Sequence, residues 1–307
     1  GRLHYRDDQR GRLTDAVPAR LREAARTDDA ALALAVYLQD GPDGLIRLEG
    51  EFALAVGDSR AGCMIGVRDP MGTHPLYWTA AGGRVALSTG VFPLVDQLPT
   101  RTLDRAYLAD FLMMPWPSDE LPGDHTTYEG VRRVPAGGTV RLDTRTGRAD
   151  RKTHWNWADR IVDPGTDRLE EIGDRYGELF RGAVRERMRG RVGSHASGGL
   201  DSTAVALTAR DWAAAGGAGT PIHTLSLVYD RLPNLCGERA YVEASLRDQP
   251  GFVRHDLAGD DHLAYADLDG DAMPHDQPVP GLCRMSMNGA TVAAAAGLGL
   301  DTLLTGH

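Results

Sequence analysis

Apolar residues in the first half of the chain come in short runs that are separated by turn-forming residues. The runs lie at 52–58, 63–69, 75–80 and 84–89, and residues 137–143 and 148–155 are consistent with a closing hairpin. Runs of this length between such turns are typical of β-hairpins. Helical spacing predicts two helices, one over 28–41 that ends at Gly41 and one over 103–114 that stops before Pro115. We therefore expect an α+β domain with antiparallel sheets.

The second half of the chain alternates helical and strand patterns instead. Helices are predicted at 168–190, 203–215, 238–248 and 285–297, and strands at 222–229, 252–257 and 301–306. Such alternation predicts parallel βαβ units in a doubly wound sheet. The polar stretch 156–167, with Pro164 and Gly165, is the predicted linker. We expect one domain over 1–158 and a second over 168–307.

Composition is that of a soluble globular protein of two domains, with 307 residues, 42% hydrophobic and 25% charged. The chain shows neither a secretory signal nor an apolar run of the ~20 residues that a membrane span needs, so we expect a cytoplasmic protein without a membrane partner. The net charge of −9 is spread along the chain. Because nucleic-acid binders carry a basic stripe, we expect no nucleic-acid partner. The three cysteines lack C-x-x-C spacing, which argues against a structural zinc site.

The string SGGLDS, Ser197–Ser202, stands where a strand pattern gives way to a helix pattern. A helix that begins at the carboxyl end of a parallel strand points free N–H groups at a bound anion. The two glycines let the main chain close around a phosphate, Ser197 and Ser202 add hydroxyl donors, and Asp201 suits a bridging Mg²⁺. The alternative is an ordinary tight turn, in which Asp201 only complements the helix dipole.

SGGLDS resembles the pyrophosphate-loop motif S-G-G-x-D-S of the ATP pyrophosphatases, which cleave ATP between its α and β phosphates. Residues 47–58 and 67–78 are similar to the R-L-x-G-x-F-A and R-D-x-x-G-x-x-P-L-Y-Y signatures of the glutamine-hydrolase-like domain of asparagine synthetases. Residues 131–142 resemble that domain's closing segment, and 302–307 resemble the family's second ATP-contact loop. The resemblance to the asparagine synthetase superfamily implies an Ntn-type α+β domain followed by a doubly wound parallel α/β ATP pyrophosphatase domain, adenine nucleotide α-hydrolase-like in fold.

The resemblance also implies a set of site residues, with ATP and Mg²⁺ as cofactors. ATP and pyrophosphate would be held by Ser197, Gly198, Gly199, Leu200, Asp201, Ser202, Leu227, Thr305 and Gly306. Asp201 and Ser202 would be the catalytic residues, and Asp201 the metal ligand. Asp276, Arg284 and His307 are candidates for substrate binding, although Asp276 and Arg284 are equally consistent with a solvated loop pair.

Three departures from the family pattern affect the expected chemistry. Residue 1 is Gly1, where a working glutaminase has a cysteine whose thiol and free amine act together, and Cys63 lies in an apolar strand and is expected in the core. No Asn-Gly pair for the oxyanion hole occurs between 14 and 50. The chain's single lysine, Lys152, cannot match the downstream lysine that stabilises departing pyrophosphate. We therefore expect a piece of a longer protein, cut at both ends and inactive alone, which uses an amine of its substrate unless residues before Gly1 carry the cysteine.

Four local features are similar to lasso peptide cyclases: His195 two residues before the motif, the segments 235–244 and 275–284, and T-G-H at 305–307. Our first hypothesis is an enzyme that adenylates an Asp or Glu side chain of a peptide, releasing AMP and pyrophosphate. It would then join that side chain to the peptide N-terminus as a macrolactam. The resemblance implies a leader-binding protein and a leader peptidase as partners. The alternatives are an asparagine synthetase, a β-lactam synthetase-like enzyme that also acts on an amino-acid carboxylate, and a non-catalytic peptide-binding homologue.

Overall fold

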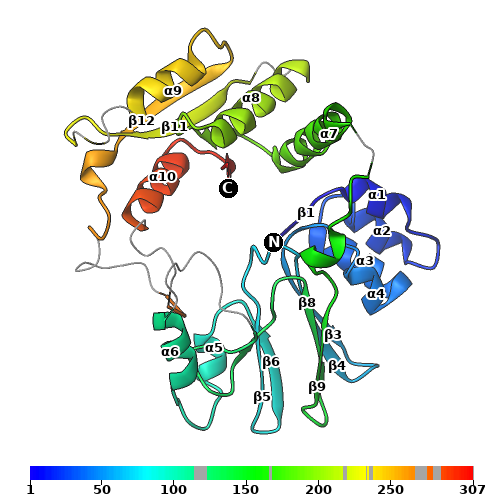
Figure 1. Ribbon diagram of the computed structural model, residues 1–307. Helices are drawn as coiled ribbons and strands as arrows, with labels where there is room; N and C mark the ends of the chain where they lie inside the picture. The colour runs from blue at the N-terminus through cyan, green and yellow to red at the C-terminus, as the bar shows by residue number, and fades with distance from the viewer. Residues whose placement is uncertain are drawn as a thin grey trace. The chain divides into compact units, whose positions relative to one another are not determined.

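The chain folds into two compact units in the computed structural model (Figure 1). The structure describes residues 1–113, 123–165, 168–216, 220–232, 234, 238–266, 275–278 and 285–306. The first unit comprises Gly1–Asp163 and Pro274–Pro280, and the second comprises Pro164–Met273 and Gly281–His307. The division after Asp163 falls inside the polar stretch 156–167. The sequence carries no signal that a segment near residue 275 belongs to the first unit.

The strands of the first unit form two antiparallel sheets and a short pair. The larger sheet has the order β3 (Ala53–Asp58), β4 (Cys63–Arg68), β8 (Gly138–Asp143) and β9 (Ala149–Thr153). The smaller sheet has the order β6 (Arg84–Ser88), β5 (Tyr77–Ala81) and β7 (Arg132–Arg133), and β1 (Arg2–Leu3) pairs with β2 (Gly50–Glu51). The three predicted hairpins are confirmed: β3–β4, β5–β6 and β8–β9 are all antiparallel.

Two of these hairpins turn by the same chemistry. The Asp58 carboxylate accepts hydrogen bonds from the amides of Arg60 (2.9 Å) and Ala61 (2.8 Å), and Gly62 follows with φ +62°. The Asp143 carboxylate binds the amides two and three residues on in the same way, and Gly147 has φ +73°. An Asp that closes its own turn, followed by a glycine in the left-handed region, is a common hairpin ending. The turn residues of the sequence therefore specify these registers.

The helices of the first unit are mostly short. They are α1 (Arg6–Gly11), α2 (Ala19–Ala24), α3 (Asp29–Asp40), α4 (Pro42–Leu45), α5 (Phe92–Val95), α6 (Arg105–Met113) and the 3₁₀ turn η1 (Trp157–Arg160). The two predicted helices, α3 and α6, are confirmed. Helix α3 starts where the Asp28 carboxylate accepts from the amides of Ala30 and Ala31, and it ends at Gly41, whose φ is +66°. These are the expected N-cap and C-cap signals.

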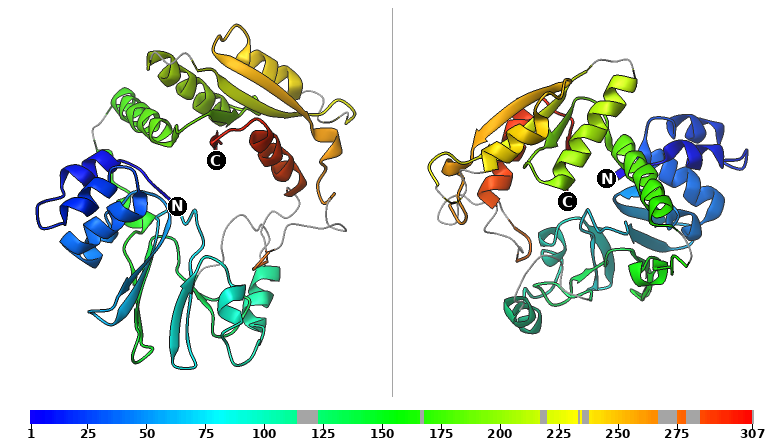
Figure 2. Two further views of the ribbon diagram at one scale, coloured as in Figure 1. Left: turned by 180° about the vertical axis from the view of Figure 1, so that it is seen from behind. Right: turned by 45° about the horizontal axis from the view of Figure 1, so that its top comes forward.

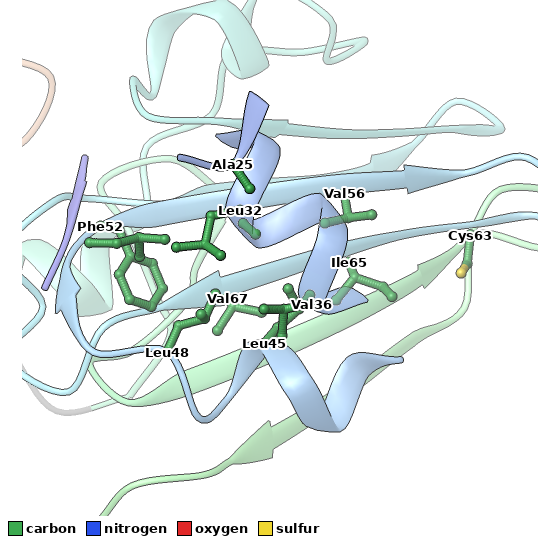
Figure 3. Close-up of a cluster of buried hydrophobic side chains, with 12 residues drawn as sticks. Ala25, Leu32, Val36, Leu45, Leu48, Phe52, Val56, Cys63, Ile65 and Val67 are labelled. Atoms are coloured by element: carbon green, nitrogen blue, oxygen red, sulfur yellow. The ribbon is translucent and has the colours of Figure 1, made fainter. Parts of the chain in front are cut away.

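Four layers follow from the way side chains alternate along the strands. Ile65 and Val67 of β4 pack with Leu32 and Val36 of α3 in one buried cluster (Figure 3). On the opposite face of the same sheet, Val140 and Leu142 of β8 pack with Leu76 and Trp78 at the smaller sheet. Successive strand residues point to opposite faces, so Tyr77, next to Trp78, packs instead with the α5 residues Leu94 and Val95. The order is helices, larger sheet, smaller sheet, helix.

The second unit is built on one parallel sheet. Its strands are β12 (Phe252–Ala258), β11 (Ile222–Val228), β10 (Val192–His195) and β13 (Thr302–Leu304), in that spatial order, and all neighbours are parallel. Its helices are α7 (Leu169–Arg187), α8 (Leu200–Ala215), α9 (Glu238–Leu246), α10 (Met285–Gly297) and the 3₁₀ turn η2 (Gly259–Asp261). Figure 2 shows α8 and α9 beside β11 and β12 in two further views. The predicted parallel sheet is confirmed.

One boundary was predicted three residues late. Helix α8 was expected from residue 203, but it starts at Leu200, directly after Gly199 in an extended conformation. Asp201 and Ser202 therefore lie in the first helical turn rather than in a loop before it. The pattern of apolar residues gave no sign of this, because Leu200 is 90% exposed and does not contribute to the core.

Candidate functional site

The spatial order of the parallel strands reverses between β10 and β13. From β10 the chain moves outward to β11 and then β12, and it returns to place β13 on the other side of β10. In open α/β sheets, the loops after two such strands diverge to opposite faces and leave a crevice at their carboxyl ends, where ligands bind. Ser197–Ser202 follow β10, and Thr305–Gly306 follow β13. The two predicted nucleotide segments thus flank the reversal point.

Gly198 fixes the path of the loop that follows β10. Its φ is +79°, in the left-handed region that favours glycine. A Cβ at this position would lie 2.7 Å from the carbonyl carbon of Tyr241 and 2.7 Å from the amide nitrogen of Val242 in α9. Both the backbone angle and the close approach to α9 therefore require glycine. The sequence predicted the glycine turn, but not that α9 is the element behind it.

The two serines of the loop are bonded to each other. The hydroxyl oxygens of Ser197 and Ser202 are 3.0 Å apart, and the Ser197 amide donates to the Ser202 hydroxyl oxygen at 3.2 Å. The Gly199 amide in turn donates to the Ser197 hydroxyl oxygen at 3.4 Å. Ser202 is only 5% exposed. The two serines thus close the loop across the start of α8, and the Ser202 hydroxyl is hydrogen-bonded within the loop.

The first turn of α8 presents main-chain amides and one carboxylate. The amides of the first three helical residues, Leu200, Asp201 and Ser202, have no partner within an α-helix, and they lie at its positive dipole end. Among the described residues, the exposed Asp201 carboxylate makes no hydrogen bond or ion pair. An anion with a divalent cation attached fits this combination of donors and a single acceptor.

Magnesium fits the site only together with an anionic ligand. Across the described parts of the chain, no group of three or more His, Cys, Asp or Glu side chains is placed to hold a metal ion. Mg²⁺ is commonly bound by one or two carboxylates together with phosphate oxygens and water, not by a cage of protein ligands. The lone Asp201 carboxylate fits that mode and would be its protein ligand.

The loop after β13 packs directly against the start of α8. A Cβ on Gly306 would lie 2.6 Å from the amide nitrogen of Ser202 and 3.0 Å from the carbonyl carbon of Asp201. The structure therefore brings Thr305–Gly306 together with Asp201–Ser202, as the site prediction requires. Arg284 and His307, predicted to bind substrate, lie outside the described residues.

Leu227 and His195 lie at the same end of the sheet. Leu227 is the sixth residue of β11, and His195 is the last of β10, opposite Leu225. Two hydrogen bonds join β11 to Ala196, the residue just before the SGGLDS loop. The Ala196 amide donates to the Leu225 carbonyl at 2.9 Å, and the fully buried Ser226 hydroxyl donates to the Ala196 carbonyl at 2.6 Å. Ser226 was not predicted; a serine between Leu225 and Leu227 in the predicted strand was the available signal.

Asp276, another candidate for substrate binding, belongs to the first unit. Its carboxylate accepts a hydrogen bond from the Val91 amide of the first unit at 2.6 Å. His275 precedes it in the same segment. Cys63 is 2% exposed and belongs to the core cluster of the first unit, which confirms its predicted structural role. Cys236 and Cys283 lie outside the described residues.

Comparisons with known proteins match a family model to part of each unit. Residues 12–155 match the glutamine amidotransferase domain, and residues 175–249 match asparagine synthase. A stretch of the first unit thus matches one domain model, and a stretch of the second unit matches the other. Both matches agree with the resemblance seen in the motifs.

Individual relatives carry names of two kinds. The chain is 26% identical over 234 residues to asparagine synthetase [glutamine-hydrolyzing] 3 of Bacillus subtilis, covering 75% of this chain and 36% of that protein. It is 29% identical over 198 residues to a putative asparagine synthetase of Mycobacterium tuberculosis, covering 60% of this chain and 29% of that protein. It is also 26% identical over 190 residues to the amidase chyE of Penicillium rubens, covering 59% of this chain and 26% of that protein.

The matched region therefore spans only about a third, or less, of these curated relatives. Separately, none of the helices in the described ranges combines the length and the apolar character needed to cross a membrane.

Proposed function

We propose that the protein is an ATP-dependent ligase that joins a carboxylate to an amine and releases AMP and pyrophosphate. The observation that supports this most strongly is the meeting of two loops at the strand reversal of the second unit. Gly306 abuts the amide of Ser202, and both lie beside the free amides of the first turn of α8. A phosphate chain at that place would meet main-chain donors from both loops.

Each site residue takes a role that its position allows. The amides of Leu200 and Asp201 bind the two outer phosphates, and Gly198 keeps the loop close enough to α9 for those amides to face outward. The Asp201 carboxylate holds Mg²⁺, which neutralises phosphate charge when bound. Thr305 and Gly306 border the α-phosphate, and Leu227 borders the nucleoside at the end of β11. These fixed groups need no rearrangement as negative charge develops on the leaving pyrophosphate.

For the substrate, we propose macrolactam closure of a peptide as in lasso peptide cyclases. The support is the set of local resemblances around SGGLDS, notably His195 at the end of β10. The fold would be an Ntn-type domain followed by an ATP pyrophosphatase domain of the adenine nucleotide α-hydrolase type. A leader-binding protein and a leader peptidase would then act in the same pathway. The substrate amine would be held near the activated carboxylate, where proximity supplies much of the rate.

Asparagine synthesis is the second candidate, and a specific observation favours it. Two of the relatives reported above bear the name asparagine synthetase, and the first unit matches a glutamine amidotransferase domain. Under this proposal, the carboxylate is that of aspartate and the amine is ammonia. β-Lactam closure would use the same site on a different amino-acid carboxylate.

The nucleotide products separate this class of ligase from others. The full-length protein, incubated with ATP, Mg²⁺ and a substrate, should release AMP and pyrophosphate and should catalyse exchange of labelled pyrophosphate into ATP. An Asp201→Asn variant should lose the exchange, whereas Asp211→Asn, at an exposed acid farther along α8, should retain it. Release of ADP would overturn the proposal, and absence of exchange with every acceptor would favour a non-catalytic binding role.

Assays with two kinds of substrate distinguish the two candidate functions. Aspartate with ammonia or glutamine should yield no asparagine, whereas a precursor peptide with an internal Asp or Glu should lose the mass of one water as its ring closes. Robust asparagine formation would reject the peptide substrate and establish the second candidate.

A further inference from the structure

A short segment from the far end of the chain belongs to the first unit. Residues 275–278 follow β12 and precede α10, both of which are elements of the second unit, yet Pro274–Pro280 is part of the first. Figures 1 and 2 show this short orange stretch beside the part of the first unit that carries α5 and α6. The chain therefore passes between the units at three points: after Asp163, before Pro274 and after Pro280.

Two side chains hold the segment in place. The Asp276 carboxylate accepts a hydrogen bond from the Val91 amide at 2.6 Å, across 185 residues of sequence. The Gln277 side-chain oxygen accepts from the Thr127 amide at 3.0 Å and from the Thr127 hydroxyl at 3.1 Å, across 150 residues. The Gln277 side-chain nitrogen donates to the Asp276 carbonyl at 2.8 Å, which ties the two anchors together.

The receiving surface is shaped for this contact. Val91 is fully buried in the cluster that packs α5 on β5, so its amide is fixed in position. A Cβ on Gly90 would lie 2.9 Å from the Asp276 carboxylate oxygen, and nothing in the backbone angle of Gly90 itself demands glycine. Gly90 thus provides room for the carboxylate. A charged acceptor on a fixed main-chain donor is among the stronger hydrogen bonds in proteins.

We propose that residues 275–278 are an anchor through which the folded second unit stabilises the first, with Gly90–Val91 and Thr127 as the docking surface. While the second unit is folded, the chain between Asp163 and Pro274 is held in one compact unit, and this keeps the effective concentration of the segment at its docking surface high. When the second unit opens, this part of the chain becomes long and flexible, and the effective concentration of the segment falls. Opening of one unit is therefore communicated to two defined amides of the other.

Hydrogen exchange at single amides of the full chain tests the anchor. Asp276→Ala should speed exchange of the Val91 amide about tenfold or more, since a hydrogen bond to a charged acceptor is lost. Gln277→Ala should speed exchange of Thr127 instead. Asp276→Asn, which keeps an acceptor oxygen, should restore much of the Val91 protection. Asp96→Ala, which removes an exposed partner of Arg101 just after α5, should leave Val91 unchanged. Unchanged protection in Asp276→Ala would overturn the anchor.

A double-mutant cycle tests the contact independently of exchange. Gly90→Ala should destabilise the chain in the presence of Asp276, because the new methyl group meets the carboxylate. In the Asp276→Ala background, the same Gly90→Ala change should cost much less. Additive effects of the two changes would contradict the contact.

The coupling itself needs a perturbation confined to the second unit. Leu225→Ala opens a cavity in the fully buried centre of β11 and should make the second unit open more often. If the anchor transmits that opening, Val91 and Thr127 exchange faster, while the Ile65 amide in β4 is unaffected. The effect on Val91 should disappear when Asp276→Ala is already present. If Leu225→Ala leaves the exchange rate of the Val91 amide unchanged, the segment contacts the first unit without coupling the two units, and the proposal is wrong.

Discussion

Gly306 stands so close to Ser202 that a Cβ on residue 306 would lie 2.6 Å from the Ser202 amide nitrogen. This contact joins the loop after β13 to the first turn of α8. A separation under 3 Å to a backbone atom cannot be relieved by rotating a side chain. Any larger residue must move one loop away from the other.

Gly306→Ala is therefore predicted to weaken ATP binding more than it weakens the fold. Overpacking of this kind costs about 1–3 kcal/mol, and the strain falls on the loops that would hold the phosphates. The dissociation constant for Mg-ATP, measured by calorimetry, should rise about tenfold. Gly289→Ala is the matched control, because a Cβ at Gly289 meets nothing within 4 Å inside α10, and it should stabilise the helix by roughly 0.5–1 kcal/mol. Equal ATP affinities in the two variants would contradict the contact.

Arg68 is predicted to be a main support of the first unit. Its side chain is 2% exposed, and the guanidinium donates to the carbonyls of His74 (2.7 Å), Gly72 (2.6 Å) and Val134 (3.1 Å). Arg68→Met should lower the free energy of unfolding by about 3–5 kcal/mol, since three carbonyl acceptors, that of Val134 among them buried, lose a charged donor. Denaturant titration followed by circular dichroism measures this loss. Arg101→Met, at an exposed ion pair with Asp96, should change it by less than about 0.5 kcal/mol.

Local pattern was sufficient to predict the longer elements of both units. The hairpins β3–β4 and β8–β9 were predictable because each turn carries its own Asp and Gly, and α3 because Asp28 and Gly41 mark its ends. Helices such as α4 and α5, with four residues each, have too few positions for a periodic pattern. Their existence depends on tertiary packing rather than on their own sequence.

Local sequence pattern could predict only part of the candidate site. SGGLDS is a local string, so its turn could be predicted, and the alternating pattern implied a parallel sheet. The contact of Gly306 with Ser202, the support of Gly198 by α9 and the capture of Asp276 by Val91 join residues far apart in sequence. No local pattern encodes such contacts. Asp276 is an example: it was a candidate for substrate binding, which stays a prediction, and its bond to the Val91 amide could not be foreseen from the sequence around it.

Stability should fall as the pH is lowered below about 6.5, and His223 is one cause. Burial lowers the pKa of His223, and the neighbouring Arg191 (3.2 Å) and His255 (2.9 Å) lower it further. The folded chain therefore binds the proton less readily than the unfolded chain. Below the ordinary value of 6.5, protonation favours the unfolded state, whereas above it the effect vanishes.

His223→Gln should flatten this dependence. Thermal melts at about pH 7.5 and about pH 5.5 should differ less in the variant than in the unchanged chain. His74→Gln, at an exposed histidine, should leave the difference as it was. His154, whose pKa is also lowered by burial, contributes in the same direction within the first unit, so a residual slope is expected in His223→Gln. If the difference in melting temperature between the two pH values is the same in His223→Gln as in the unchanged chain, His223 has the same pKa in the folded and unfolded states and the prediction is wrong.

Tyr37 is predicted to resist deprotonation. Its hydroxyl donates to the Asp58 carboxylate at 2.6 Å, and this bond, together with burial, raises the pKa of Tyr37 to about 12. Ultraviolet titration, with Tyr37→Phe as the difference reference, should show one tyrosine ionising well after exposed ones. In Asp58→Asn the pKa of Tyr37 should return toward 10. A Tyr37 that ionises at the ordinary value in the unchanged chain would refute the bond.

The central claim is that the loop at the start of α8 holds the outer phosphates of ATP through its amides and through a cation on Asp201. Calorimetric titration of the full-length protein with ATP, in Mg²⁺ and in EDTA, tests it most directly. We predict that Mg²⁺ tightens binding to the unchanged protein, that Asp201→Ala abolishes this gain without altering the affinity in EDTA, and that Asp211→Ala preserves it. Identical Mg²⁺ dependence in Asp201→Ala and the unchanged protein would contradict the account.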